Sequence, residues 1–97
     1  MRPSQILQKH RAEVLEIMKR YPMLANLRVF GSVARGDDTE KSDIDFLVDA
    51  LPGTTLFDLG GAQDDLESFL GVPVHLLTHG ELFLGFRDTC LQEALPV

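Results

Sequence analysis

Two short motifs carry the residues best suited to chemistry. The first is Gly31-Ser32, and the second, after ten intervening residues, is Asp43-Ile44-Asp45. Glycine lets a backbone turn tightly and approach a ligand, and amide groups at a following helix start can donate hydrogen bonds to an anion. Ser32 adds a hydroxyl. The first motif therefore predicts a turn that holds phosphate groups.

The second motif predicts a metal site. Side chains two apart in a strand point to the same face, so we expect Asp43 and Asp45 to share a face while Ile44, Phe46 and Val48 point into a core. Two neighbouring carboxylates repel each other unless a cation lies between them, and a hard cation with oxygen ligands suits such a pair. Mg²⁺ or Mn²⁺ is the first expectation.

Each motif also has a simpler interpretation. Gly-Ser alone is typical of an ordinary turn, and alternate aspartates on a strand commonly face solvent. Their combination favours a site, because the spacing permits the aspartate strand to return beside the turn. Residues 37–49 also hold six acids against the single cation Lys41, a repulsion that a divalent ion would relieve.

The remaining sequence predicts elements that position these motifs. We expect a helix from Ser4, as its cap, to about Arg20, because apolar residues recur at helical spacing there. A strand over residues 27–30 should lead into Gly31, followed by a polar loop over residues 37–42. We then expect a strand over 43–48 and a helix over 56–70, capped by Thr55 and ended by Gly71. A strand over 74–77 and a broken helix over 78–95 should follow.

Length and composition bound the fold. The chain has 97 residues, of which 44% are hydrophobic and 25% charged, as expected of one compact domain with one core. Cys90 is the only cysteine, which excludes an internal disulfide. No apolar run approaches the roughly 18 residues of a membrane span, and the N-terminus lacks the apolar centre of a signal peptide. We expect a cytoplasmic protein without a membrane partner.

The net charge of −6 is unevenly distributed. Residues 1–36 carry seven Lys/Arg against two acids, and residues 37–97 carry two Lys/Arg against thirteen acids. The acidic part would repel a phosphate backbone, so we expect no direct nucleic-acid binding. An acidic surface suits a basic protein partner, although a solvated face with no partner explains the same bias.

The two motifs together resemble a known signature. Gly31-Ser32, ten residues and Asp43-Ile44-Asp45 resemble the signature of the polymerase-β-like nucleotidyltransferase superfamily, and Ala34-Arg35-Gly36 with Ser42 resembles its minimal (MNT) branch. The start of the expected 56–70 helix also resembles sequences of this branch, and so do the C-terminal residues 91–97. The resemblance implies an α/β (α+β) nucleotidyltransferase fold, a small mixed sheet flanked by helices, with residues 1–97 as a single domain.

The resemblance also implies an activity. Gly31 and Ser32 would hold the outer phosphates of ATP, while Asp43 and Asp45 would bind Mg²⁺ or Mn²⁺ for attack on the α-phosphate. Arg35 could neutralise triphosphate charge or form a surface ion pair. Minimal members often act as antitoxins in hetero-oligomers with HEPN ribonuclease toxins, which they adenylylate on tyrosine or mask by contact. The apolar run 82–86 could serve such a partner or the chain's own core.

The chain departs from this pattern at His75. The branch normally has a third aspartate there, and histidine is a poor Mg²⁺ ligand that serves Mn²⁺ or Zn²⁺ acceptably. Asp49 cannot replace it, since four strand residues place it about 13 Å beyond Asp45. His75 or His79 could act as a general base, or either could be structural.

Two functions therefore stay open. In the first, the protein would be an enzyme that transfers AMP to a protein side chain, with Asp43, Asp45 and His75 as catalytic residues. Alternatively it is a binding module that has lost catalysis and neutralises its partner by contact. The intact Gly-Ser and Asp-x-Asp motifs favour the enzyme, whereas His75 favours the binding module.

Overall fold

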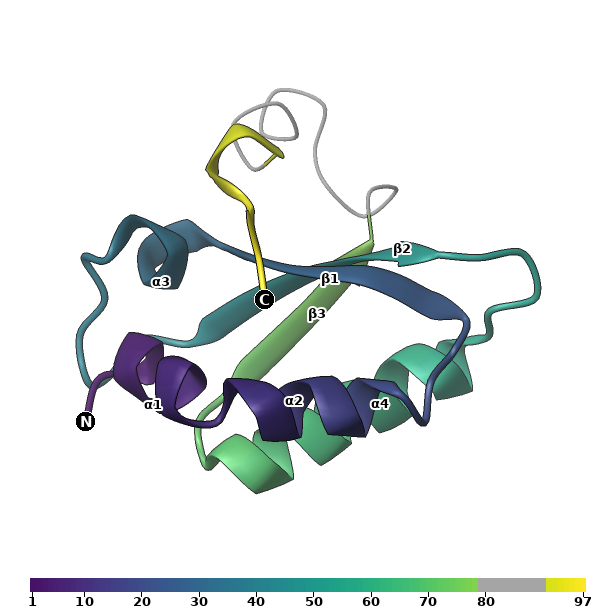
Figure 1. The fold of residues 1–97 in the computed structure, drawn as a ribbon, viewed down its shortest axis with the longest axis horizontal. Helices are drawn as coiled ribbons and strands as arrows, with labels where there is room; N and C mark the ends of the chain where they lie inside the picture. Colours follow the sequence, from purple (N-terminus) through teal and green to yellow (C-terminus); the bar gives the residue numbers. More distant parts are fainter. Residues whose placement is uncertain (79–90) are drawn as a thin grey trace.

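The computed structural model describes residues 1–78 and 91–97. Its helices are α1 (Pro3–Lys9), α2 (Arg11–Met18), α3 (Gly31–Arg35) and α4 (Leu56–Leu70), and its strands are β1 (Leu24–Phe30), β2 (Ile44–Ala50), β3 (Val74–Thr78) and β4 (Leu95–Pro96). These elements share one core beneath a single sheet (Figure 1).

The sheet is mixed and four-stranded, in the order β3-β2-β1-β4. Strand β1 runs antiparallel to β2 and β4, whereas β2 and β3 are parallel and connected through α4. Because β1 and β2 are antiparallel, the end of β1 lies beside the start of β2, where Phe30 pairs with Asp45. This topology brings the glycine-serine turn next to the aspartate motif, and it confirms the expected small mixed sheet flanked by helices.

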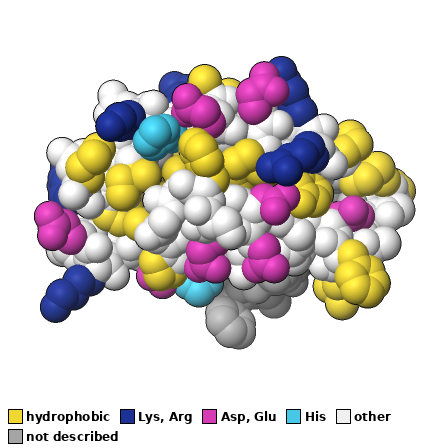
Figure 2. All heavy atoms as spheres, turned by 90° about the horizontal axis from the view of Figure 1, so that it is seen from below, with side chains coloured by type: hydrophobic (Ala, Val, Ile, Leu, Met, Phe, Trp, Pro, Cys, Tyr) yellow, Lys and Arg dark blue, Asp and Glu magenta, His cyan; other side chains and the backbone are white. Residues whose placement is uncertain are grey.

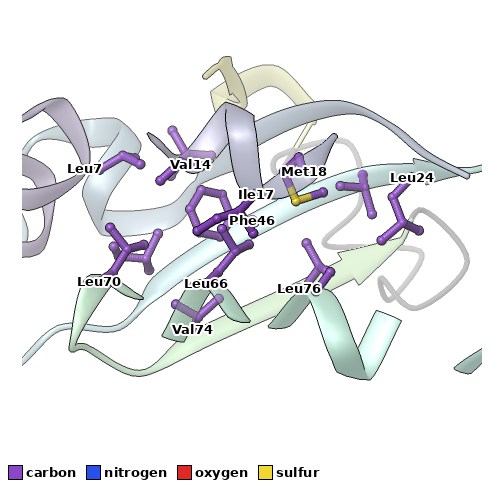
Figure 3. Packing of buried hydrophobic residues seen from close by; sticks show 14 of the residues in the cluster. Leu7, Val14, Ile17, Met18, Leu24, Phe46, Leu66, Leu70, Val74 and Leu76 are labelled. Atoms are coloured by element: carbon purple, nitrogen blue, oxygen red, sulfur yellow. The ribbon is translucent and has the colours of Figure 1, made fainter. Parts of the chain in front are cut away.

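The core lies between the sheet and helices α1, α2 and α4, which cover one of its faces (Figure 1). Ile44, Phe46 and Val48 of β2 are fully buried there, as their alternation predicted. Figure 3 shows Phe46 among side chains of the helices and of β3. The labelled members of this cluster are Leu7, Val14, Ile17, Met18, Leu24, Phe46, Leu66, Leu70, Val74 and Leu76.

The opposite face of the sheet carries a second, smaller cluster. Phe30 and Leu47 are buried there, with Leu77 and Ala94 packed against them. Asp45 and Leu47 have the same parity on β2, so this is also the face that carries the aspartate site. The helices therefore form the base of the fold, and the chemistry lies on the other side of the sheet.

The N-terminal helix departs from its prediction in two respects. It begins at Pro3 with Arg2 as its N-cap, not at Ser4, because proline has a helical φ and lacks the N–H that a first turn leaves unpaired. It also breaks at His10, whose φ of −112° and ψ of 23° separate α1 from α2. The His10 ring packs edge-on against Phe69 of α4, with ring centroids 5.4 Å apart. The periodicity of the N-terminal helix cannot reveal this contact, because Phe69 is distant in the sequence.

All three predicted strands are longer than predicted, β3 by one residue, Thr78. Strand β1 starts at Leu24 and β2 extends to Ala50, because these two residues pair across the hairpin. Strand β2 begins at Ile44, so Asp43 lies one residue before it. The register shifts between Ala25 and Arg28, beside Asn26 with its positive φ of 56°.

Helix α4 has the predicted boundaries. The Thr55 hydroxyl accepts a hydrogen bond from the Asp58 N–H, and the Asp58 carboxylate accepts one from the Thr55 N–H, which closes a capping box. Gly71 ends the helix with φ 73°. The helical spacing of its apolar residues predicts one buried face, made of Leu56, Leu59, Leu66, Phe69 and Leu70. This prediction is wrong at the first turn, since Leu56 is 85% exposed. The buried residues of α4 begin only at Ala62, where the helix starts to cover the sheet.

Phe69, also assigned to that apolar face, is 43% exposed, although its ring packs on His10. Other α4 side chains close the outer edge of β3. Gln63 accepts a hydrogen bond from the Leu76 N–H at 3.1 Å, and Glu67 accepts one from the Val74 N–H at 3.1 Å. These contacts satisfy strand donors that face away from β2.

The predicted broken helix over residues 78–95 falls mostly outside the described residues, together with His79, Cys90 and the run 82–86. Residues 91–93 are helical, as predicted, but the two ends of the range are strands, which corrects the prediction there. Thr78 pairs with Val48, and Leu95 pairs with Val29, so both ends join the sheet through ladders that the local sequence does not reveal.

On the face formed by the helices, acidic side chains alternate with basic and hydrophobic ones, and no continuous basic surface is visible in this view (Figure 2). Within the described residues, no helix combines the length and the apolar character that crossing a bilayer requires.

Candidate nucleotide and metal site

The turn at the end of β1 begins with a glycine in a special conformation. Gly31 has φ 72° and opens the short helix α3 directly after buried Phe30. A β-carbon on residue 31 would lie 2.7 Å from Asp45 Oδ2, a distance that real β-carbons essentially never show. Two features therefore favour glycine at position 31: the left-handed backbone conformation and the close approach of Asp45. The two predicted motifs meet at this contact.

The aspartate motif lies at the start of the central strand. Asp45 pairs with Phe30 of β1 on one side and with His75 of β3 on the other. Asp43 reaches the same place from the residue before the strand, because its Oδ2 is 2.9 Å from His75 Nε2. The three predicted catalytic residues thus gather on one face of the sheet, beside Gly31.

The contact between Asp43 and His75 is open to solvent. Their side chains are 42% and 54% exposed, and the role of the imidazole nitrogen as donor or acceptor depends on its tautomer. A ligand entering from this face could reach both side chains. His75, the residue at which the family resemblance implies a third carboxylate, is therefore accessible and is not part of the hydrophobic core.

The environment of Asp45 disfavours the ionised form of its carboxyl group. Burial raises the pKa of its carboxyl above 3.8, and the negative charge of Asp43 raises it further, while His75 and Arg35 pull it down. Among residues 1–78 and 91–97, no side chain or backbone group donates a hydrogen bond to this carboxylate. Asp45 is therefore a partly buried acid whose carboxylate has no hydrogen-bond donor among the described residues.

A divalent cation fits this arrangement. Mg²⁺ in nucleotide sites is commonly bound by one or two carboxylates together with substrate phosphates, and the Asp43 and Asp45 carboxylates offer such a pair. His75 does not complete an all-protein site, since the described residues contain no group of three His, Cys, Asp or Glu side chains arranged to hold a metal. The residues thus fit an ion that substrate phosphates help to hold.

Comparison with known proteins identifies the fold family. The nucleotidyltransferase domain model matches residues 11–94. "Protein adenylyltransferase MntA" of Thermococcus cleftensis is 35% identical over 92 residues, which cover 95% of this chain and 89% of the relative. A solved "putative minimal nucleotidyltransferase" superposes with a TM-score of 0.84 at 38% identity, covering 97% of this chain and 95% of the other. The chain belongs to the minimal nucleotidyltransferases.

Two further matches extend the comparison. A Methanocaldococcus jannaschii relative named "Putative protein adenylyltransferase MJ0435" is 41% identical over 69 residues, which cover 71% of this chain and 74% of that relative. A chain from a crystal structure of a toxin–antitoxin with AMP-PNP shares the fold, with a TM-score of 0.74 at 20% identity over 88% of this chain and 69% of the other.

The other two predicted ligand residues of this minimal nucleotidyltransferase lie on α3. The Ser32 hydroxyl forms no hydrogen bond to any described residue, so it is available to a phosphate. Arg35 is engaged instead: its Nε lies 3.2 Å from Asp37 Oδ2 and its Nη1 lies 3.1 Å from Glu93 Oε2. Of the two predicted roles of Arg35, this structure shows the ion pair.

One supporting residue of this minimal nucleotidyltransferase escaped the sequence analysis. Asp38 has a fully buried side chain in the loop between the turn and the aspartates, and its Oδ2 accepts a hydrogen bond from the Ser4 N–H at 2.9 Å. Its Oδ1 has no hydrogen-bond partner among the residues that the structure describes, and it lies 3.9 Å from Arg2 Nη1. Hydrogen bonds from Ser4 hold the pKa of Asp38 below its usual value despite burial. Asp38 thereby anchors α1 to the loop beside the site.

Proposed function

We propose that this protein transfers AMP from ATP to a tyrosine of a partner toxin of the HEPN ribonuclease class and so neutralises it. Residues 1–97 would act as one minimal domain in a hetero-oligomer with that toxin. The observation that carries the proposal is the contact between the Gly31 turn and Asp45, with Asp43 and His75 on the same face. Relatives named protein adenylyltransferases, and a fold neighbour from a toxin–antitoxin with AMP-PNP, support it.

In this proposal, some of the site residues bind the phosphates and others bind the metal ion. The backbone at Gly31 and the Ser32 hydroxyl hold the outer phosphates, and Arg35 offers a guanidinium to the triphosphate. Asp43 and Asp45 hold Mg²⁺ or Mn²⁺, which when bound neutralises phosphate charge and stabilises the entering and departing oxygens. Most of the catalysis is therefore positioning and charge neutralisation.

The transfer of AMP is a single displacement at the α-phosphorus. The tyrosine hydroxyl oxygen bonds to the α-phosphorus, the bond from that phosphorus to the oxygen bridging the β-phosphate breaks, and pyrophosphate leaves. His75 accepts the hydroxyl proton, since it is exposed beside the aspartates and an imidazole nitrogen can act as a general base. His75 would thus take over the activating role that a third carboxylate has elsewhere in the family.

A second candidate function rests on the same residue. His75 occupies the place of the third carboxylate, and no complete metal-binding group of three exists among the described residues. The protein would then be a binding module that neutralises the toxin by direct contact. Both functions predict a complex, but only the first predicts covalent AMP on the partner.

A labelling experiment separates the two functions. The protein is incubated with the toxin encoded beside it and with ATP labelled at the α-phosphate, in Mg²⁺ and in Mn²⁺. The enzyme hypothesis expects label on a toxin tyrosine, located by peptide mapping, and its loss in Asp45→Asn. The matched control is Asp64→Asn, which makes the same change at an exposed position of α4. A stable complex without label in either metal would leave only the binding module.

A further inference from the structure

Arg35 is held by two carboxylates from different parts of the chain. Asp37 is its neighbour in the loop after α3, whereas Glu93 comes from the C-terminal segment, 58 residues away. Glu93 lies two residues before β4, whose pairing with β1 fixes the segment at the edge of the sheet. Glu93 is thus brought to Arg35 by the fold and not by local sequence.

In the proposed function, the guanidinium that Glu93 holds belongs to the nucleotide site. Arg35 is the last residue of the five-residue helix that starts at Gly31, and its positive charge offsets a small part of the rise in the pKa of Asp45. A guanidinium presents the same fork of N–H donors to a carboxylate and to a phosphate. The donors directed at Glu93 and Asp37 are therefore withheld from a phosphate.

We propose that Glu93 competes with the ATP triphosphate for the Arg35 guanidinium and thereby sets the affinity for ATP. This inference rests on the proposed function, because it takes ATP as the ligand of the turn. Glu93 is a positioning residue, since it acts through Arg35 and touches no reacting atom. The contact can open readily: the Arg35 side chain is 46% exposed, and exposed ion pairs are weak.

A double-mutant cycle on ATP binding tests the competition. Calorimetry would give Kd for ATP with wild type, Glu93→Gln, Arg35→Gln and the double variant. We expect Glu93→Gln to tighten binding about two- to five-fold, the size of an exposed ion pair. Arg35→Gln should weaken binding, and Glu93→Gln should add little in that background. In transfer assays Glu93→Gln should lower KM for ATP and leave kcat unchanged.

The control separates a local contact from general charge. Glu16→Gln also removes one negative charge, but Glu16 of α2 pairs with Lys19, the C-cap of that helix, and its replacement should leave Kd unchanged. Unchanged or weaker binding by Glu93→Gln would overturn the competition, as would equal tightening with and without Arg35.

Failure of the proposed function gives a different pattern. Binding that is absent in wild type, or insensitive to both Ser32→Ala and Asp45→Asn, overturns the nucleotide site and the competition with it. Binding that depends on those two residues but ignores Glu93 overturns the competition alone.

Discussion

Gly31 and Asp45 lie closer together than any side chain on residue 31 would allow. The Oδ2 atom of Asp45 stands 2.7 Å from the position of a β-carbon on Gly31, which also has a left-handed φ of 72°. The antiparallel pairing of β1 with β2 brings these two residues from the ends of neighbouring strands. The close approach of turn and carboxylate thus depends on a single missing methyl group.

Gly31→Ala should abolish ATP binding and lower the free energy of unfolding. The new methyl group must displace Asp45, and an L-residue in this conformation costs roughly 1–2 kcal/mol. Urea denaturation and ATP calorimetry measure the two effects. Gly71→Ala is the matched control, because Gly71 has φ 73° and nothing within 4 Å of its β-carbon position. It should show the stability loss alone, and loss of ATP binding by both variants would contradict the steric argument.

Asp45→Asn should stabilise the metal-free protein while it removes transfer. The pKa of Asp45 is raised above 3.8, so the folded state holds its proton more tightly than the unfolded state does. Stability therefore falls as pH rises from 3.8 through the folded pKa, and the ionised carboxylate destabilises the fold at neutral pH. Removing this charge should raise Tm at pH 7 by about 2–4 °C.

Thermal unfolding without metal checks this result, with Asp64→Asn as the control for loss of one charge at an exposed position. The variant should also lose the acid-side slope that Asp45 gives the wild type. A lower Tm for Asp45→Asn would show that its carboxylate is stabilised by contacts other than those described.

The elements that the sequence predicted well have local signals. Helix α4 is bounded by the reciprocal Thr55 and Asp58 contacts and by Gly71, all within one turn of its ends. The alternation of β2 placed its core side chains correctly, and the motif spacing placed Gly31 beside the aspartates. Each of these signals operates over a few residues or one hairpin, so the sequence alone contains it.

The elements that sequence could not predict depend on distant partners. Strand β4 has two residues and no alternation, and it exists because β1 offers it an edge. The contacts of Arg35 with Glu93 and of Asp38 with Ser4 span 58 and 34 residues. No local pattern marks Asp38 as buried among the acids of its loop, so only the folded structure reveals that it anchors the N-terminal helix.

Asp38→Asn should destabilise the protein by about 1–3 kcal/mol, the range for hydrogen bonds to a buried charged group. The folded pKa of Asp38 is lowered, so its stabilisation is present above pH 3.8 and is lost as pH falls through the folded value. Urea denaturation at pH 7 and at about pH 3 should show a large difference between wild type and variant at pH 7 and a smaller one in acid. An equal difference at both pH values would contradict an ionised Asp38.

His75→Asp should convert the site to three carboxylates and raise its dependence on Mg²⁺. Without metal the new carboxylate faces Asp43 at the position where His75 Nε2 now lies 2.9 Å away, so repulsion should lower Tm. Mg²⁺ supplies the missing positive charge and prefers oxygen ligands, so it should raise Tm more in the variant than in wild type, by the linkage between binding and folding. Transfer in Mg²⁺ should also increase.

His75→Asn is the control for this change, because it removes the imidazole without adding a charge. It should lose transfer in both metals if His75 accepts the tyrosine proton, and it should gain nothing from Mg²⁺. Should His75→Asp bind Mg²⁺ more tightly yet transfer no faster, then the third ligand is not what limits the reaction. Rate would then depend on the proton acceptor at residue 75, for which imidazole is the better group near neutral pH.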